Sequence, residues 1–187
     1  LIAYSQDYAD HSYYLKPFKK KVTPIYPPIH MPEPNLEHAK ELRASWSKDG
    51  GPIIGFSGRF VEEKRPDLLL RALEVVNQHY PNARVVFCGE YEIAYEDTWE
   101  RHQDLVKQYR EQLIFLGLKN DMQYMADFYA ACDVLALTSD SECFALVQVE
   151  AMLSGTPVVM TNTPGGRVPV RETGMGKLAD VGDWQSI

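Results

Sequence analysis

Two carboxylates, Glu142 and Glu150, lie eight positions apart where a polar loop runs into a predicted helix. Carboxylate oxygens accept hydrogen bonds from the hydroxyl groups of sugars, often two at a time. Between the two carboxylates, the predicted helix start presents the backbone amides of Phe144, Ala145 and Leu146. Free amides and the helix dipole together favour an anion. The stretch therefore predicts a ligand with hydroxyl-bearing groups at both ends and an anionic group between them.

A second loop, which begins at Gly58 and ends at Lys64, supplies positive charge. Gly58 lets the backbone approach a ligand closely, Arg59 offers a planar fork of donors that suits phosphate, and Lys64 adds a compact cation. Two cations on one loop offset the charge of a diphosphate. A diphosphate flanked by two polyols describes a nucleotide-sugar, with Glu150 at the ribose and Glu142 at the sugar to be transferred.

These assignments have ordinary alternatives, which the sequence leaves open. Arg59 and Lys64 could instead pair with surface carboxylates, because exposed ion pairs are common and weakly stabilising. The nearby carboxylates are Glu62, Glu63 and Asp67. Glu142 could be a helix-start carboxylate without a ligand, and Glu150 a helix residue that faces solvent. The alternatives weaken together, because all four residues are expected at one edge of the same sheet.

Short apolar segments alternate with amphipathic segments from residue 53 onward, which predicts parallel βαβ units. The apolar segments are nearly continuous, as expected for strands buried on both faces of a sheet. We expect strands at residues 53–57, 83–88, 113–116, 134–137, 157–160 and 177–179. We expect helices at residues 66–80, 97–110 (polar and exposed), 122–132 and 145–153, the last capped by Asp140 or Ser141. The predicted fold class is α/β, a Rossmann-like parallel sheet with helices on both faces.

The loops that follow parallel strands meet at one edge of the sheet, and ligands of open α/β sheets bind there. We expect five such loops to face one crevice, at residues 58–64, 89–95, 117–120, 139–145 and 162–166. In the third loop, backbone groups around Leu118 could contact a base, the alternative being an ordinary strand exit. The aromatic residues Tyr91, Tyr95 and Trp99 could stack on a base or sugar, the alternative being helix packing.

The first 50 residues differ in composition from the rest of the chain. A short strand is expected at residues 1–5, followed by an aromatic and basic stretch that we interpret as solvated surface. Five prolines between residues 22 and 34 favour extended geometry and predict a linker. Asn35 is predicted to cap a helix that runs to about Ser47, with a break beginning at Lys48.

Composition and charge exclude several classes of protein. The 187 residues carry a formal net charge of −7, which argues against a general nucleic-acid binder. Three cysteines at scattered spacing argue against a disulfide framework. The five histidines lack metal-ligand spacing, so no metal is expected. No apolar run approaches the roughly 20 residues that span a bilayer, and the absence of dinucleotide and P-loop fingerprints disfavours those nucleotide sites.

Two motifs carry a family resemblance. The first is Gly58-Arg59 with Lys64, and the second is Glu142-x7-Glu150 running on into Ala-Met-Leu-Ser-Gly-Thr-Pro-Val-Val. Together they resemble the donor-binding, C-terminal half of retaining GT-B glycosyltransferases, in the family called glycosyltransferases group 1. The resemblance implies two Rossmann-like domains with the active site in the cleft between them. It also implies sugar transfer with retention of anomeric configuration and no requirement for a metal or other cofactor.

The resemblance assigns roles to residues at matching positions. It implies that Arg59 and Lys64 hold the diphosphate and stabilise the leaving group, and that Glu150 binds the ribose. It implies that Glu142 contacts the donor sugar and acts as nucleophile, charge stabiliser or sugar clamp. The family usually has Gly-Phe-Gly where this chain has Cys-Phe-Ala, so Ala145 adds a methyl group where the backbone approaches the donor.

The resemblance extends over about residues 51–187, which we interpret as a nucleotide-sugar-binding domain without its C-terminal helices. Residues 1–50 are interpreted as the end of an acceptor-binding domain followed by the interdomain linker. The chain is therefore expected to begin inside a larger protein and to be inactive alone. The expected partners are a nucleotide-diphosphate sugar and, through the other domain, an acceptor glycan, lipid or small molecule, as in polysaccharide biosynthesis.

Two alternatives from other classes remain open at this point. One is a sugar-nucleotide epimerase or hydrolase on the same scaffold, and the other is a non-catalytic nucleotide-sugar-binding module, for which Ala145 is the hint. No nucleic-acid partner is expected. A cytoplasmic location is expected, with the inner face of the membrane as a candidate contact of the whole protein.

Overall fold

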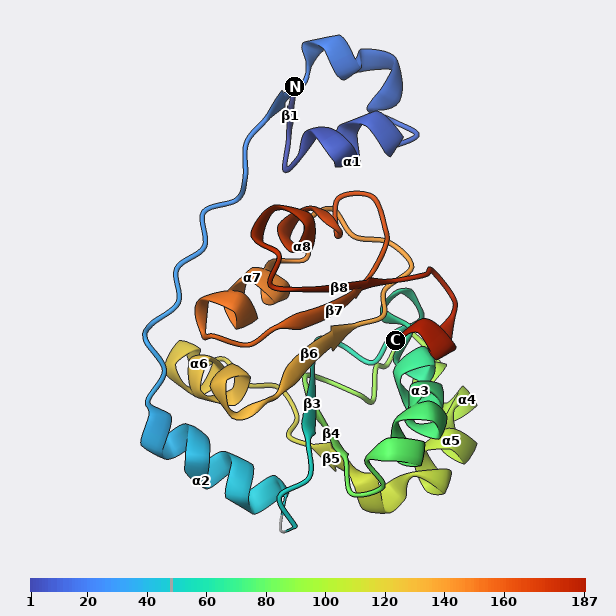
Figure 1. The fold of residues 1–187 in the computed structure, drawn as a ribbon. Helices are drawn as coiled ribbons and strands as arrows, with labels where there is room; N and C mark the ends of the chain where they lie inside the picture. Colours follow the sequence, from blue (N-terminus) through green and yellow to red (C-terminus); the bar gives the residue numbers. More distant parts are fainter. Residues whose placement is uncertain (48) are drawn as a thin grey trace.

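The computed structural model describes residues 1–47 and 49–187, so Lys48, the expected start of the break after the first helix, lies outside the described residues. Six parallel strands form the main sheet in the order β5-β4-β3-β6-β7-β8 (Figure 1). They are β3 (Ile53–Ser57), β4 (Arg84–Cys88), β5 (Leu113–Phe115), β6 (Val134–Leu137), β7 (Val158–Thr161) and β8 (Gly176–Ala179). Helices cover both faces of this sheet, which confirms the predicted Rossmann-like α/β fold.

The strand order reverses at β3, whose two neighbours are β4 and β6. Ile54 and Gly55 of β3 pair in parallel with β4 on one side and with β6 on the other. The chain therefore leaves β3 toward one half of the sheet and leaves β6 toward the other, which opens a crevice outside the carboxyl ends of these strands. The loops after β3 and β6 are those that carry Lys64 and Glu142.

Two layers of helices bury the apolar faces of the sheet (Figure 1). On one face, Phe128 and Tyr129 of α6 pack with Trp46 of α2. On the other face, Leu69 and Leu73 of α3 pack against the strands, and burying each such side chain contributes about 1.5–3 kcal/mol. The first layer contains α2 (Leu36–Trp46), α6 (Met122–Ala131), α7 (Leu146–Leu153) and α8 (Val168–Thr173). The second contains α3 (Pro66–His79), α4 (Thr98–Arg101) and α5 (Gln103–Gln108).

One helix prediction is wrong in two respects. The single helix expected at residues 97–110 is two short helices, because His102 adopts φ −105° and ψ 15° and ends the first of them. The stretch is not exposed throughout, since Val106 is buried and Trp99 packs edge-on against Phe60. A break at residue 102 lets each short helix turn its own apolar side chains toward the sheet. A further helix, α8, has only six residues and was not predicted from the sequence.

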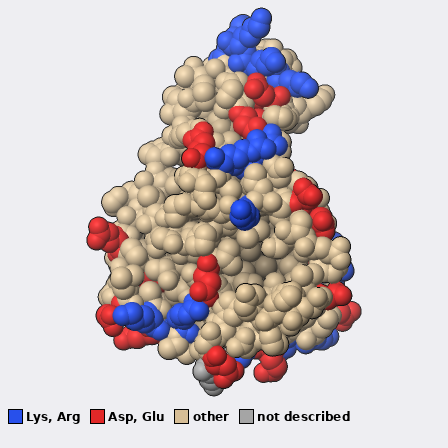
Figure 2. Space-filling model, in the orientation of Figure 1, with Lys and Arg blue, Asp and Glu red and all other residues tan. Residues whose placement is uncertain are grey.

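The N-terminal segment contains β1 (Ile2–Ala3), α1 (Gln6–His11), a 3₁₀ helix (Lys16–Lys21) and β2 (Thr23–Pro24). β1 and β2 pair in parallel, apart from the main sheet. Residues 25–35 then run without regular structure down to α2 (Figure 1). Asn35 caps α2 as predicted, because its side chain accepts hydrogen bonds from the amides of Glu37 and His38. In Figure 2, Lys and Arg side chains gather over the N-terminal segment, whereas both signs of charge mix over the rest of this face.

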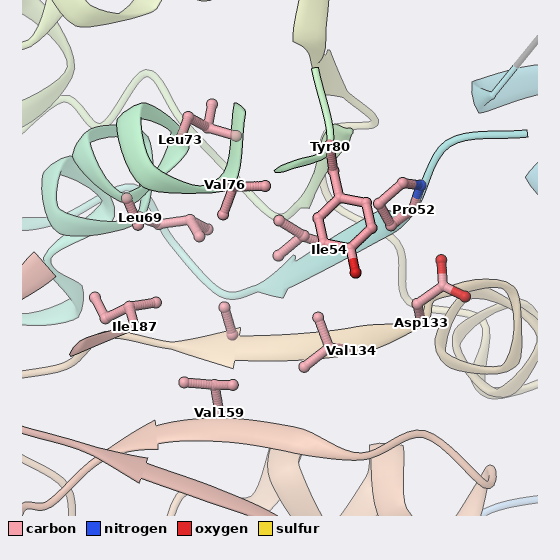
Figure 3. A pocket seen from close by; sticks show the side chains of 12 residues that line it. Pro52, Ile54, Leu69, Leu73, Val76, Tyr80, Asp133, Val134, Val159 and Ile187 are labelled. Carbon is pink, nitrogen blue, oxygen red and sulfur yellow. The ribbon is translucent and has the colours of Figure 1, made fainter. Parts of the chain in front are cut away.

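An apolar pocket of about 330 Å³ lies between α3 and the sheet (Figure 3). Leu69 and Val76 of α3 face Ile54 of β3 and Val134 of β6 across it, with Asp133 at the rim. None of the residues predicted to bind ligand lines this pocket. Small-molecule sites need a few placed polar groups to fix an orientation, and this lining offers few. The chemistry therefore has to be sought at the carboxyl edge of the sheet.

Candidate functional site

A pocket of about 340 Å³ opens at the carboxyl ends of β3 and β6, where the strand order reverses. Six residues singled out in the sequence line it, namely Gly58, Arg59, Lys64, Glu142, Ala145 and Leu146. The structure thus brings the loop from Gly58 to Lys64, here called the cationic loop, together with the start of α7. Ligands of open α/β sheets bind at such a reversal of strand order.

Lys64 and Glu142 contact each other in the wall of this pocket. The Lys64 Nζ lies 2.5 Å from the Glu142 Oε1, and the two side chains are only 26% and 11% exposed. The Ser139 hydroxyl donates to the same carboxylate oxygen at 2.9 Å. Lys64, in the loop after β3, therefore pairs with a residue of the loop after β6 rather than with a carboxylate of its own loop. Replacing only one member of such a shielded ion pair is costly, because the charge of the other member is left without a partner.

Arg59 lies at the mouth of the pocket, where its Nη1 donates a hydrogen bond to the hydroxyl of Tyr95. In the part of the chain that the structure describes, no carboxylate forms an ion pair with Arg59, and Glu62 and Asp67 pair with other arginines. The expected alternative of surface pairing therefore does not hold for Arg59 either. Its guanidinium keeps further donors available for an anion.

Two residues with strained backbone flank the pocket. Arg65 (φ 48°) follows the cationic loop and Ala145 (φ 57°) precedes α7, and no other non-glycine residue of the described ranges has a positive φ. A side chain in this region costs roughly 1–2 kcal/mol, and such residues cluster at functional sites. Arg65 is held by ion pairs with Asp67 and Asp140, and its carbonyl oxygen accepts from the Thr138 hydroxyl at 2.8 Å. These contacts tie the loop after β3 to the loop after β6.

The start of α7 differs from the prediction. Neither Asp140 nor Ser141 caps the helix, because Ala145 occupies the cap position without a side-chain hydrogen bond and the helix begins at Leu146. The Asp140 carboxylate is engaged instead in the ion pair described above. Within residues 1–47 and 49–187, no oxygen accepts a hydrogen bond from the amides of Phe144, Ala145 or Leu146. The amides predicted to bind an anion thus have no protein acceptor there, and Ala145 and Leu146 line the pocket, whereas Phe144 does not.

Gln148, which the sequence analysis did not single out, braces the loop that carries Glu142. Its side chain is fully buried, and its Nε2 donates to the carbonyl oxygens of Phe144 (2.8 Å) and Gly166 (2.7 Å). A Cβ added at Gly166 would lie 2.3 Å from the Met160 methyl carbon and 3.0 Å from the Glu142 Cβ. The space beside Gly166 is thus occupied by neighbouring side chains, and the turn after β7 packs directly against Glu142. The only signal in the sequence was a polar residue on the buried side of a helix.

Glu150 is engaged from α6 rather than exposed to solvent on all sides. Its Oε2 accepts a hydrogen bond from the Tyr129 hydroxyl at 2.8 Å, and the Ser57 Oγ lies 3.1 Å from that hydroxyl. Burial, helped by the charge of Glu150, raises the pKa of Tyr129. Glu150 does not line the main pocket, but Ser57 does, so this chain of contacts joins Glu150 to the edge of the pocket. Tyr129 was missed in the sequence, where it reads as an ordinary helix residue.

A smaller pocket of about 160 Å³ adjoins the first and shares Ser57, Gly58 and Arg59 with it. Leu118, in the loop after β5, lines this second pocket and is 56% exposed. A Cβ added at Gly89 would lie 2.0 Å from the Gly58 carbonyl oxygen, so a glycine is required for the loops after β3 and β4 to come this close. Because they share these residues, the two pockets lie side by side along the loops after β3, β4, β5 and β6.

The aromatic residues after β4 divide between two roles. Tyr91 and Trp99 pack on each other and on Phe115, with ring centroids 4.9 to 5.2 Å apart. For Tyr91 and Trp99 the structure thus shows the alternative of helix packing rather than side chains free to stack on a base or sugar. Tyr95 remains exposed and contacts Arg59, so it is the member of the cluster that reaches the mouth of the pocket.

The N-terminal segment touches the loops after β6 and β7. The Asp7 carboxylate accepts hydrogen bonds from Nη2 and Nε of Arg167, at 2.6 and 2.9 Å, and from the Gly165 amide at 2.8 Å. The Tyr26 ring packs against the ring of Phe144 with centroids 5.3 Å apart. The position of the N-terminal segment is thereby linked to the loops that form the pocket.

Asp7→Asn is expected to lower the free energy of unfolding by about 1–3 kcal/mol at neutral pH, because Asp7 accepts charge-assisted hydrogen bonds. Partial burial raises the pKa of Asp7, but hydrogen bonds from Arg167 and Gly165 outweigh it, and the pKa is lowered from the ordinary 3.8. A lowered pKa adds stability above the unfolded-state value, and this stability is lost as the pH falls through the folded-state value. The difference from the wild type should therefore shrink below about pH 4.

Urea unfolding across an acidic to neutral pH series measures this difference, with the exposed Asp104→Asn as the matched control. A difference that stays constant down to the lowest pH would contradict the ion pair. So would an Asp7→Asn variant as stable as the wild type at neutral pH.

Two negative findings apply to the part of the chain that the structure describes. No group of three or more His, Cys, Asp or Glu side chains there is arranged to hold a metal ion. None of its helices combines the length and the apolar composition that crossing a bilayer requires.

Comparison with known sequences gives a consistent result. The family model described as "Glycosyl transferases group 1" matches residues 38–187. The D-inositol 3-phosphate glycosyltransferase of Corynebacterium jeikeium (strain K411) is 34% identical over 138 residues, which cover 68% of this chain and 31% of that protein. The protein of the same description from Mycolicibacterium smegmatis is 36% identical over 138 residues, covering 71% of this chain and 30% of that protein. This chain thus spans less than a third of the length of these relatives.

Comparison with solved structures extends the likeness to nearly the whole chain. Anabaena Alr3699/HepE, in complex with UDP and glucose, matches with a TM-score of 0.78 and 25% identity over 99% of this chain and 50% of that chain. Sucrose-phosphate synthase from Thermosynechococcus elongatus matches with a TM-score of 0.82 and 25% identity over 99% of this chain and 46% of that chain. Because each match covers 99% of this chain, the likeness extends over its six-stranded sheet and flanking helices.

Proposed function

This chain belongs to the glycosyl transferases group 1 family, and we propose that it supplies the donor site of an enzyme that transfers a sugar from a nucleotide-diphosphate sugar with retention of anomeric configuration. The observation that carries the proposal is the pocket at β3 and β6, where Lys64, Glu142 and the open amides before α7 converge. A cation, a carboxylate and free amides in one pocket suit a diphosphate next to a sugar. A neighbour of the same fold binds UDP and glucose, which supports this choice of ligand.

In the proposed reaction, the groups of this chain stabilise the departing nucleotide diphosphate. Arg59 and Lys64 donate to its oxygens, and the start of α7 adds free amides and the helix dipole. These donors are held in place before the bond breaks, and such preorganised donors are commonly the largest single contribution to catalysis. Glu142, beside Lys64, contacts the donor sugar, where its charge stabilises the positive charge that develops at the anomeric carbon. We propose a reaction without a metal, because Arg59 and Lys64 supply the positive charge that a metal ion would otherwise bring.

We assign the nucleoside end of the donor to the smaller adjoining pocket. Backbone groups near Leu118 would contact the base there, since the loop after β5 forms its wall. Glu150 would accept hydrogen bonds from the ribose, because its carboxylate is joined through Tyr129 and Ser57 to the edge that both pockets share. The donor would therefore lie along the sheet edge, with the base at β5 and the sugar at β6.

For the whole protein, we propose that residues 51–187 form the donor domain and that residues 1–50 are the end of an acceptor-binding domain and its linker. The contacts of Asp7 and Tyr26 with the loops around the pocket support an acceptor side next to Glu142. The acceptor would be a hydroxyl group of a glycan, a lipid or a small molecule. We expect this chain alone to bind donor without transferring the sugar.

A thermal-shift screen with UDP-, GDP-, ADP- and dTDP-sugars tests the proposal. One nucleotide class should raise Tm, since a ligand at 100 times its Kd stabilises the folded state by about 2.7 kcal/mol. Arg59→Gln should reduce that shift, whereas Arg71→Gln, on the exposed side of α3, should leave it unchanged. The proposal fails if no nucleotide-sugar raises Tm, or if Arg59→Gln responds as the wild type does.

A further inference from the structure

Tyr129 is the largest fully buried side chain of the described residues. A buried phenol needs partners for its hydroxyl group, and this one has two, the Oε2 of Glu150 at 2.8 Å and the Oγ of Ser57 at 3.1 Å. Glu150 belongs to α7, Tyr129 to α6, and Ser57 is the last residue of β3. The hydroxyl of Tyr129 therefore lies where three elements of the candidate site meet.

The chemistry of the three groups fixes the direction of these hydrogen bonds. A carboxylate only accepts hydrogen bonds, so Tyr129 donates to Glu150 and Ser57 donates to Tyr129. Burial raises the pKa of Tyr129, which keeps the proton on the phenol at neutral pH. Across the described ranges, no side chain or amide donates to the other oxygen of Glu150, Oε1. One oxygen of Glu150 is thus fixed by protein, and the other is left to accept from a ligand.

We propose that Tyr129 is a positioning residue that holds Glu150 in the orientation that meets the ribose hydroxyl groups of the nucleotide, with Ser57 directing the Tyr129 proton toward Glu150. The inference rests on the proposed function and deepens it, since Tyr129 lies behind the site and takes no part in binding the base or the diphosphate. Without the hydroxyl of Tyr129, Glu150 would be free to rotate. The ribose would then lose an oriented acceptor, while contacts to the other parts of the nucleotide would persist.

The test compares UDP with 2′-deoxy-UDP, or the corresponding pair for the nucleotide that gives the largest thermal shift in the screen above. Titration calorimetry on the wild type should show that UDP binds more tightly than its 2′-deoxy analogue. In Tyr129→Phe, the affinity for UDP should fall roughly fivefold to tenfold, in keeping with the loss of one ordinary net hydrogen bond to the ribose. The affinity for 2′-deoxy-UDP should change less than about twofold. That ligand lacks the 2′-hydroxyl, one of the groups from which an oriented Glu150 would accept a hydrogen bond.

Two further variants separate positioning from folding. Tyr124→Phe, on the same helix, removes a hydroxyl without a hydrogen-bond partner in the described ranges and should leave both affinities unchanged. Ser57→Ala leaves Tyr129 in place. It should reduce the ratio of the affinity for UDP to the affinity for 2′-deoxy-UDP by a smaller factor than Tyr129→Phe does. A merely structural role of Tyr129 would weaken both nucleotides alike and leave their ratio unchanged, which would overturn the inference while the proposed function stands. Failure of the wild type to bind any nucleoside diphosphate would overturn both.

Discussion

Lys64→Met should weaken the binding of UDP by about 10- to 150-fold, because a charge-assisted hydrogen bond is worth about 1.5–3 kcal/mol. The loss has two causes. The diphosphate loses the cation that faces it, and Glu142, only 11% exposed, keeps a negative charge that is no longer paired. That charge then repels the diphosphate in a partly desolvated pocket, where electrostatic interactions are stronger than in water. Titration calorimetry with UDP measures the effect.

A double variant tests this explanation. Lys64→Met combined with Glu142→Gln removes both charges, so part of the lost affinity should return, as expected for two groups in direct contact. Lys40→Met, an exposed lysine on α2, is the matched control and should bind UDP as the wild type does. If Lys64→Met binds UDP with wild-type affinity, Lys64 does not hold the diphosphate. If the double variant binds UDP no more tightly than Lys64→Met alone, the repulsion by Glu142 is absent.

Glu142→Gln should lower turnover at least about 100-fold, the scale observed when one preorganised electrostatic contact to a transition state is removed. The same change should leave UDP affinity equal to the wild-type value or slightly higher, because Lys64 is released from its ion pair and becomes available to the diphosphate. Opposite effects on chemistry and on nucleotide binding would place Glu142 at the sugar end of the donor. Turnover is measured as release of the nucleoside diphosphate from the nucleotide-sugar that raises Tm most in the screen, with a panel of hydroxyl-bearing acceptors.

This experiment uses the longer protein with the acceptor-binding domain that we propose, and Glu111→Gln, exposed and away from the pocket, is the matched control. Equal losses of turnover and UDP affinity would show that Glu142 holds the nucleotide rather than the sugar. Unchanged turnover would exclude Glu142 from the reaction altogether.

The sheet and the convergence of the two motifs could be predicted from the sequence because they follow from local patterns. β3 and β6 have the bounds that their apolar runs predicted. Parallel strands place their exits on one edge, so the loops with Lys64 and Glu142 had to face the same crevice. Even the ion pair between them is a consequence of this topology, although its partner choice was left open by the sequence.

The remaining parts of the site depend on contacts between distant segments, which the sequence pattern does not reveal. Asp140 or Ser141 was expected to cap α7, but the Asp140 carboxylate forms an ion pair with Arg65, which lies far away in the chain. Ala145 then takes a left-handed conformation that an alanine rarely adopts unless its surroundings hold it there. Gln148 and Tyr129 read as ordinary helix residues until the carbonyl groups and the carboxylate that they contact are in place.

The position of the diphosphate in a structure of the protein bound to UDP is the most direct evidence for or against this donor site. We expect phosphate oxygens within about 2.7–3.2 Å of the Lys64 Nζ, the Arg59 guanidinium and an amide at the start of α7. We also expect the ribose to lie against Glu150. A diphosphate bound away from α7, or a UDP molecule in the apolar pocket beneath α3, would show that the donor site lies elsewhere.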